Sequence, residues 1–338
     1  MTRGPDTPSD LAQTTDDVPG GKWFARYETA VARDAAQALL DERAARLARC
    51  IELARSEPDG KRIRKLRVAT RRADMAVRFA APVANSQTAK RARRALQTLR
   101  RAGGAVRRCD VFIARLRETA AAARGQDIAE ASIALIGRLG GERGAAQRAF
   151  VDALASDETI RAVREVEAAG CIDECSSTDS LAMAMLKRAG EDFMATSNAP
   201  ALDFDGLHTF RLRVKRLRYA AESAAPVIGH QAAAELIHAA TPLQDELGTV
   251  NDLAELAAEL GGFHADMTSV SGLGTLRSGL DRMLLAASSE RDRRAVAFGA
   301  RRRACIAPVV SALASLRPRT SLRLAEEISR PNSKSETA

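Results

Sequence analysis

Apolar and basic residues recur along residues 64–80 with the period of an α-helix, and the two kinds fall on opposite faces. The apolar face carries Leu66, Ala73 and Val77, and the basic face carries Arg64, Arg67, Arg71 and Arg78. A disordered basic tail would show no such separation, because nothing orders its side chains around an axis. The segment is therefore predicted to be a helix that packs by one face and presents arginines on the other.

The segment QTAKRARRALQTLRRAGGAVRR, residues 87–108, repeats this separation of faces. Its basic stripe consists of Lys90, Arg94, Arg101 and Arg108, and its apolar stripe of Ala92, Leu96, Leu99 and Val106. Between the two segments, AAPVANS is a turn signal. The pattern predicts a helical hairpin with two basic stripes, which form a cationic groove if they face each other and a basic surface if both face outward.

The second half of the chain repeats the first at a shift of 144 residues. Over residues 64–106 the ungapped alignment gives thirteen identities in 43 pairs, including Arg67 with Arg211, Arg72 with Arg216 and a shared AAPV run. Alanine richness raises such counts, but an ungapped register of this length indicates a tandem duplication of a helical unit. Pseudo-twofold packing of the two copies is expected.

The second copy keeps the first basic stripe and loses the second. Its first helix has Phe210, Val214, Leu217 and Ala221 on one face, and on the opposite face His208, Arg211, Lys215 and Arg218. Its second helix, QAAAELIHAATPLQDELG, is nearly neutral where the first copy reads QTAKRARRALQTLRRAGG. The strongest positive field therefore belongs to the first copy.

Composition agrees with a helical protein that has one anion-binding region. Hydrophobic residues make up 46% of the 338 positions and aromatic residues only 4%, a mixture rich in alanine, leucine and arginine that favours helices over strands. The net charge is +9, but residues 61–108 hold sixteen Lys or Arg and one acid, Asp74, and so carry +15. The rest of the chain sums to −6, so this block indicates an anionic partner.

Several other classes of protein are disfavoured. No apolar run approaches the roughly 18 residues of a transmembrane helix. Residues 1–21 lack the apolar core of a secretory signal and are expected to form a disordered lead-in. Five scattered cysteines fit a reduced, cytoplasmic setting better than a disulfide framework. Cys171 and Cys175 have no second pair nearby, which favours two ordinary thiols over a zinc site.

The pattern H-x-x-R-x-x-x-[K/R]-R, which opens a long helix in each copy, resembles the CHAD family, the conserved histidine α-helical domain. The second copy matches it fully with His208, Arg211, Lys215 and Arg216, and the first copy retains Arg67, Arg71 and Arg72. A glycine expected after each second helix also fits, in GGAVRRCDV and LGTVNDL. Two departures, Arg64 for the first histidine and Arg107-Arg108 for an Arg-Asp pair, both add positive charge.

The resemblance covers residues 22 to 318 and implies an all-α domain of two pseudo-symmetric helical bundles, with a basic central groove or pore that binds inorganic polyphosphate. It also implies an association with polyphosphate granules. The chemistry agrees, because a linear chain of phosphates without bases calls for repeated charge-assisted contacts, which arginine forks supply.

Two alternatives follow from the same residues. A nucleic-acid backbone would also fit the basic stripes, although the basic segments offer few aromatic side chains for stacking. An enzyme would need a motif that the sequence lacks: there is no phosphate-binding glycine loop, no Ser/His/Asp set and no acidic metal cluster. The nearest match to the E-x-E-x-K strand motif of fused triphosphatase domains is EVEAA at residues 165–169, without the lysine.

The sequence thus predicts a lead-in at 1–21, a first CHAD repeat at 22–165, a second at 178–318 and a polar tail at 319–338. The predicted function is non-catalytic binding of polyphosphate, without cofactor or metal. The predicted contacts are Arg64, Arg67, Arg71, Arg72, Arg78, Lys90, Arg94, Arg101, Arg108, His208, Arg211, Lys215, Arg216 and Arg218. A last Arg-rich stretch with Arg294, Arg301 and Arg302 either adds a wall to this site or forms a charged exterior face.

Overall fold

The described part of the chain is folded almost entirely into α-helices and contains no β-strand, which confirms the predicted all-α fold. The computed structural model describes residues 32–82, 84–169, 178–199, 202–267 and 274–317. The predicted lead-in, the polar tail and the cysteines Cys171 and Cys175 lie outside these residues.

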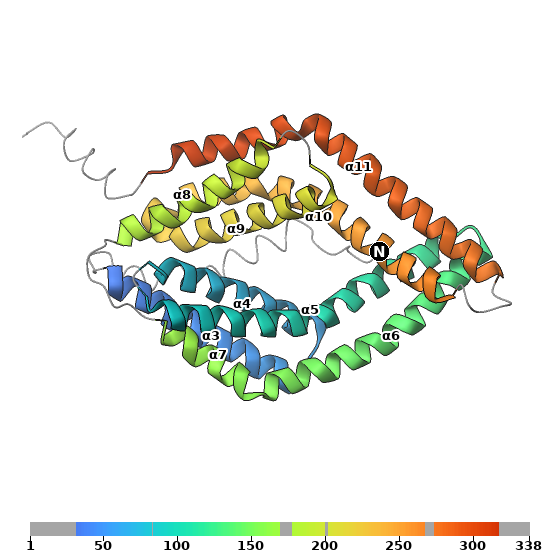
Figure 1. Ribbon diagram of the computed structural model, residues 1–338, viewed down its shortest axis with the longest axis horizontal. Coiled ribbons are helices and arrows are strands. Elements are labelled where there is room, and N and C mark those ends of the chain that lie inside the picture. Colours follow the sequence, from blue (N-terminus) through green and yellow to red (C-terminus); the bar gives the residue numbers. More distant parts are fainter. Residues whose placement is uncertain (1–31, 83, 170–177, 200–201, 268–273, 318–338) are drawn as a thin grey trace, which may run out of the picture.

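The helices follow one another in two series that lie one above the other in Figure 1. The first series consists of α3 (Ala32–Ser56), α4 (Gly60–Ala80), α5 (Ser86–Ala122), α6 (Gln126–Ala155) and α7 (Asp157–Glu167). The second consists of α8 (Thr178–Ser197), α9 (Phe204–Ile228), α10 (His230–Met267) and α11 (Gly274–Ser315). The outer helices α6 and α11 run along opposite flanks and converge at one end of the molecule.

Side-chain caps fix where the basic helices begin. The carboxylate of Asp59 accepts the backbone N–H of Arg62 at the start of α4, and that of Asp203 accepts the N–H of Gly206 at the start of α9. Asn85 caps α5 in the same way, so the predicted turn between residues 80 and 86 is confirmed. These caps set the rotation of each helix relative to the chain that enters it.

The expectation that glycines end the second helix of each copy was wrong. Both α5 and α10 continue without a break through Gly104 and Gly248 for five further turns or so. A glycine costs about 1 kcal/mol relative to alanine inside a helix, a cost that packing along the rest of a 37-residue helix outweighs. The glycines serve a close approach described below.

The repeat register is visible in the helix boundaries. Adding 144 to the first residues of α4 and α5 gives the first residues of α9 and α10. The continuous helix α11 stands in the second half where α6 and α7 stand in the first, separated at Ser156. The two halves therefore share the starting points of two successive helices, while pseudo-twofold packing and the division into domains stay predictions.

Two apolar cores hold the helices together, and each draws on both halves. The larger core includes Phe79 and Leu96 from the first half and Phe210 and Leu236 from the second. The smaller core joins the far ends of α5, α6, α10 and α11. Because the long helices α5 and α10 run from one core to the other, they position their polar faces rigidly between the two.

Candidate functional site

The basic faces of α4 and α9 turn toward each other where these two helices pack. Lys215 of α9 lies close enough to Arg67 and Arg71 of α4 for their charges to lower its pKa. The pKa of Arg216 is likewise lowered, by burial and then by the nearby charge of Arg78. The basic stripes of α4 and α9 therefore face each other. The two arrangements left open by the sequence concerned the stripes of α4 and α5, and a groove or pore at this place stays a prediction.

Six basic side chains gather at this contact, and we call them the cationic cluster: Arg67, Arg71, Arg100, Arg107, Arg211 and Lys215. Among the described residues, one ion pair within 4.0 Å reaches the cluster, between Arg211 Nη2 and Asp252 Oδ1 at 3.8 Å. Like charges at such short range repel, so the cluster is a site where positive charge is held in excess.

Lys215 is the member of the cluster whose charged form is most destabilised by its surroundings. Burial, followed by the charges of Arg211 and Arg71, lowers its pKa to about 7, and Asp252 offsets this only in part. The side chain makes no hydrogen bond or ion pair that the described part of the chain supplies. An anion placed here would restore the proton and remove the repulsion.

The pKa of Lys215 gives stability a predictable pH dependence. An unfolded lysine has a pKa of about 10.4, so above about pH 7 the unfolded chain binds more protons at this position than the folded chain. The free energy of unfolding should then rise with pH by up to about 1.4 kcal/mol per unit in this window. Urea denaturation of the wild type and of Lys215→Met at about pH 6, 7.5 and 9 measures it. Parallel pH profiles of the two proteins would contradict the assignment.

Arg67 is held against a glycine of the neighbouring helix. Its Nη1 donates a hydrogen bond to the backbone carbonyl of Arg100 at 3.0 Å. Burial, together with Arg71, Arg100 and Arg107, lowers its pKa to about 10. A Cβ atom at Gly104 would lie 2.6 Å from the same Nη1, so only glycine leaves room for this guanidinium.

Replacing Gly104 by alanine should therefore strengthen α5 and weaken binding of a polyanion. The methyl group forces the Arg67 guanidinium out of its position, and losing one oriented charge-assisted contact should lower affinity about tenfold. Gly248→Ala is the matched control, because the nearest atom to its Cβ is Arg211 Nε at an ordinary 3.9 Å. Binding titrations of the two variants measure the difference, and equal losses of affinity would contradict the role of Gly104.

Basic residues at the edges of the contact share acids. Asp74 accepts from both Arg78, at 3.0 Å, and Arg93, at 3.1 Å. On the other side, Asp192 of α8 accepts from Arg213 and Arg216 at 2.6 and 2.7 Å. Each carboxylate is thus divided between two guanidinium groups, which leaves a positive balance at both edges.

Arg72 serves a different purpose from its neighbours. Its Nε lies 2.6 Å from Glu222 Oε1 of α9, and both side chains are mostly buried. Arg43 of α3 is only 3% exposed and interacts electrostatically with Glu222, Arg72 and Glu42. This buried group joins α3 and α4 to α9, so Arg72 makes a structural contact between the halves, and its contact with a ligand stays a prediction.

The remaining predicted contacts lie in two places. His208 Nδ1 is 2.5 Å from Asn251 Oδ1, and Arg218 donates to Gln244 at 2.8 Å, so both join α9 to α10. The other predicted residues are solvent-exposed and belong to the outer faces of α4 and α5: Arg64, Lys90, Arg94, Arg101 and Arg108. Burial, and to a smaller extent the nearby charge of Arg101, lowers the pKa of Arg100. Arg108 Nη2 lies 3.8 Å from Glu142 Oε2.

Two members of the cluster, Arg100 and Arg107, are absent from the contacts predicted by sequence. Each directly follows a buried seam residue, Leu99 or Val106, and they are seven positions apart. A basic residue that flanks an apolar seam lies beside the partner helix, half-buried, whereas the stripe opposite the seam points to solvent. Position relative to the seam was therefore the signal that could have found them.

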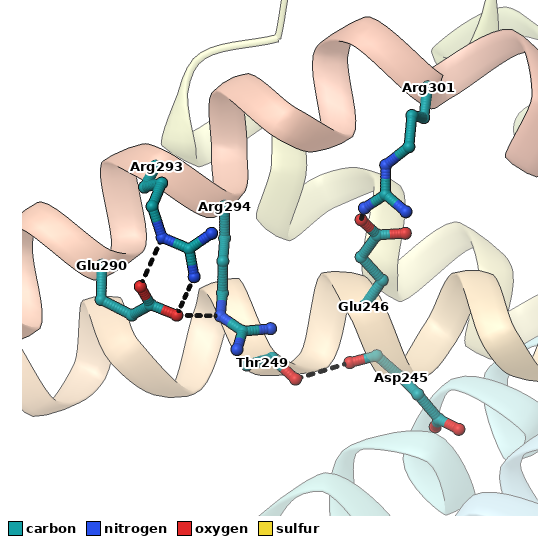
Figure 2. A network of polar contacts seen from close by, with 7 residues as sticks. All are labelled: Asp245, Glu246, Thr249, Glu290, Arg293, Arg294 and Arg301. Carbon is teal, nitrogen blue, oxygen red and sulfur yellow. Dashed lines mark hydrogen bonds and ion pairs between the residues drawn. The ribbon is translucent and has the colours of Figure 1, made fainter.

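Three arginines of the Arg-rich part of α11 pair with acids, as Figure 2 shows for Arg293, Arg294 and Arg301. Arg302 donates to the backbone carbonyls of Thr196 and Ser197 of α8. Glu290 accepts from Arg293 and from Arg294, at 2.7 and 2.6 Å. Arg301 reaches Glu246 of α10 at 2.5 Å. Since α11 packs on α10 and α6, this favours the charged exterior face over a wall of the site.

Neither a metal centre nor a membrane span is found in the part of the chain that the structure describes. No group of three or more His, Cys, Asp or Glu side chains there could hold a metal ion. None of the described helices combines the length and the apolar character needed to cross a bilayer.

Comparisons with known proteins agree with the geometry. The CHAD domain family matches residues 38–261. A crystal structure of the CHAD domain from the plant Ricinus communis superposes with a TM-score of 0.63 at 20% identity, covering 86% of this chain and 94% of that one. PptA from Streptomyces chartreusis gives a TM-score of 0.63 at 15% identity, covering 84% and 99%. No curated protein sequence matches the chain.

Proposed function

The chain belongs to the CHAD domain family, and from this premise we propose that it binds inorganic polyphosphate through the cationic cluster, without catalysing a reaction. The observation that carries the proposal is the excess of cations at the α4–α9 contact. Six basic side chains converge there, and one ion pair with an acid reaches them among the described residues. A linear polyanion neutralises such a cluster and removes its internal repulsion.

The chemistry of the contact favours a phosphate chain over a nucleic acid. Arginine forks bind phosphate oxygens equally well in either ligand, so the difference lies in the bases. Single-strand binders supply exposed aromatic faces for stacking, but Phe79 and Phe210 of the basic helices are buried. Tyr219 is only partly exposed, and the ring of Phe204, at the start of α9, is covered by the Arg291 guanidinium at 4.1 Å. The site therefore offers charge without a stacking platform.

The donors of the cluster suit the binding of an anion. The cluster consists of five arginines and Lys215, whose pKa of about 7 an anion would raise, and no nucleophile–base pair is positioned among these six residues. Recruitment to polyphosphate granules follows if the ligand is long enough to engage several copies of the protein at once.

A competition titration tests the proposal. Labelled long-chain polyphosphate is bound at fixed salt and challenged separately with single-stranded DNA, with RNA and with pyrophosphate, because every polyanion contact depends on ionic strength. We expect polyphosphate to resist displacement by either nucleic acid at equal phosphate concentration. Displacement by DNA or RNA at comparable phosphate concentration would show a general polyanion surface and overturn the proposal.

A further inference from the structure

Equivalent arginines of the two halves have different surroundings. Arg67 and Arg211 correspond under the 144-residue shift, and each lies against the corresponding glycine, Gly104 or Gly248. Arg211 has a counter-ion, Asp252, at 3.8 Å. The residue that corresponds to Asp252 in the first half is Arg108. The first half therefore has a cation at the position where the second half has the acid that pairs with Arg211, and this cation, Arg108, lies 3.8 Å from Glu142 of α6.

The same difference extends along the two long helices. The exposed stripe of α5 corresponds position by position to a stripe of α10 that has no Lys or Arg and two acids. The pairs are Lys90 with Ala234, Arg94 with His238, Arg101 with Asp245 and Arg108 with Asp252. Since α5 rises about 1.5 Å per residue, its basic stripe is about 27 Å long.

The two ends of the α4–α9 contact also differ in charge. At one end Arg72 pairs with Glu222 at 2.6 Å. The corresponding residues at the other end are Arg216 and Arg78, two cations that repel each other and pair with acids of their own halves, Asp192 and Asp74. At both places the acid thus belongs to the second half, as Asp252 and Glu222, and the corresponding residue of the first half is a cation, Arg108 or Arg78.

We propose that the track for the polyanion is formed mainly by the first half, and that the ligand lies across Arg67 and Arg71 and continues along the exposed stripe of α5. The second half contributes Lys215 at the contact, while Arg211 is held by Asp252. This inference rests on the polyphosphate-binding function proposed above and assigns the ligand's path within it. The reason is energetic: Arg211 must give up an ion pair before it can bind phosphate, whereas Arg67 has none to give up among the described residues.

Matched variants of the full chain test the inference, with binding of long-chain polyphosphate measured at fixed salt. Arg67→Ala is expected to lower affinity by at least about tenfold, and its counterpart Arg211→Ala by less than about threefold. The double variant Arg94→Ala/Arg101→Ala should lose affinity, while the double variant at the corresponding positions of α10, His238→Ala/Asp245→Ala, should not.

One further variant removes no cation. Asp252→Asn frees Arg211, so affinity should rise by about threefold or more. This result keeps the inference testable even if an arginine variant fails to fold, which thermal melting detects.

The two ways of failing are distinguishable. If wild-type protein binds no polyphosphate, the proposed function falls and the inference with it. If it binds, but the paired variants in α4 and α9 or in α5 and α10 lose affinity equally, the function stands and the one-sided track is overturned.

Discussion

Replacing Arg67 and Arg71 together by glutamate is expected to abolish polyphosphate binding while leaving the helical content unchanged. Both side chains belong to the cationic cluster, and both act on Lys215 across the α4–α9 contact. Each substitution removes a charge-assisted contact with a phosphate, worth about 1.5–3 kcal/mol, and adds a repelling charge. Affinity should therefore fall by more than about a hundredfold. Titration with labelled polyphosphate and far-ultraviolet circular dichroism are the two measurements.

The control must change the net charge by the same amount at another place. Arg161→Glu/Lys187→Glu meets this condition, because both residues are exposed and lie on α7 and α8. If a general positive field attracted the ligand, the two double variants would lose affinity alike. We expect the control to lose at most about half as much binding free energy as the cluster variant loses.

Replacing Glu222 by alanine is expected to be the most destabilising single substitution among the ion pairs described here. The change leaves the mostly buried Arg72 without its carboxylate partner, and it leaves the buried Arg43 with Glu42 of its own helix as the remaining acid, at 3.7 Å. Removing one partner of a buried pair typically costs about 3–5 kcal/mol, because the remaining charge is neither solvated nor paired. Urea denaturation at neutral pH measures the loss.

Glu290→Ala is the comparison for this experiment. Glu290 also accepts from two arginines, but it lies on the outer face of α11, where water replaces the lost contacts. Its loss should cost at most about 1 kcal/mol. A cost below about 1 kcal/mol for Glu222→Ala as well would contradict a structural role for the ion pair between α4 and α9.

The sequence predicted the helices because their signals are local. Apolar residues at helical spacing, the turn ending in Asn85 and the ungapped repeat register are all readable without knowing what packs against what. The same signals predicted that the faces of α4 and α9 are basic. They failed at Gly104 and Gly248, where a glycine signals a helix end just as readily as a close approach by a side chain from another helix.

The role of each arginine was decided by partners far away along the chain. Arg72 and Arg71 are neighbours in sequence, yet Arg72 pairs with Glu222 in the second half and Arg71 stands beside Lys215. Arg100 and Arg107 became cluster members because their positions beside the apolar seam bring them to α4. A charge pattern on one helix cannot contain this information.

What the sequence determined by itself is the all-α fold, the two-copy register and the location of the positive charge, because side-chain period, caps and composition act over a few residues. What only the tertiary structure decided is which cations remain in excess. That outcome depends on burial and on counter-ions brought within about 4 Å by packing, and the Coulomb energy between charges falls steeply beyond such distances in a screened protein surface.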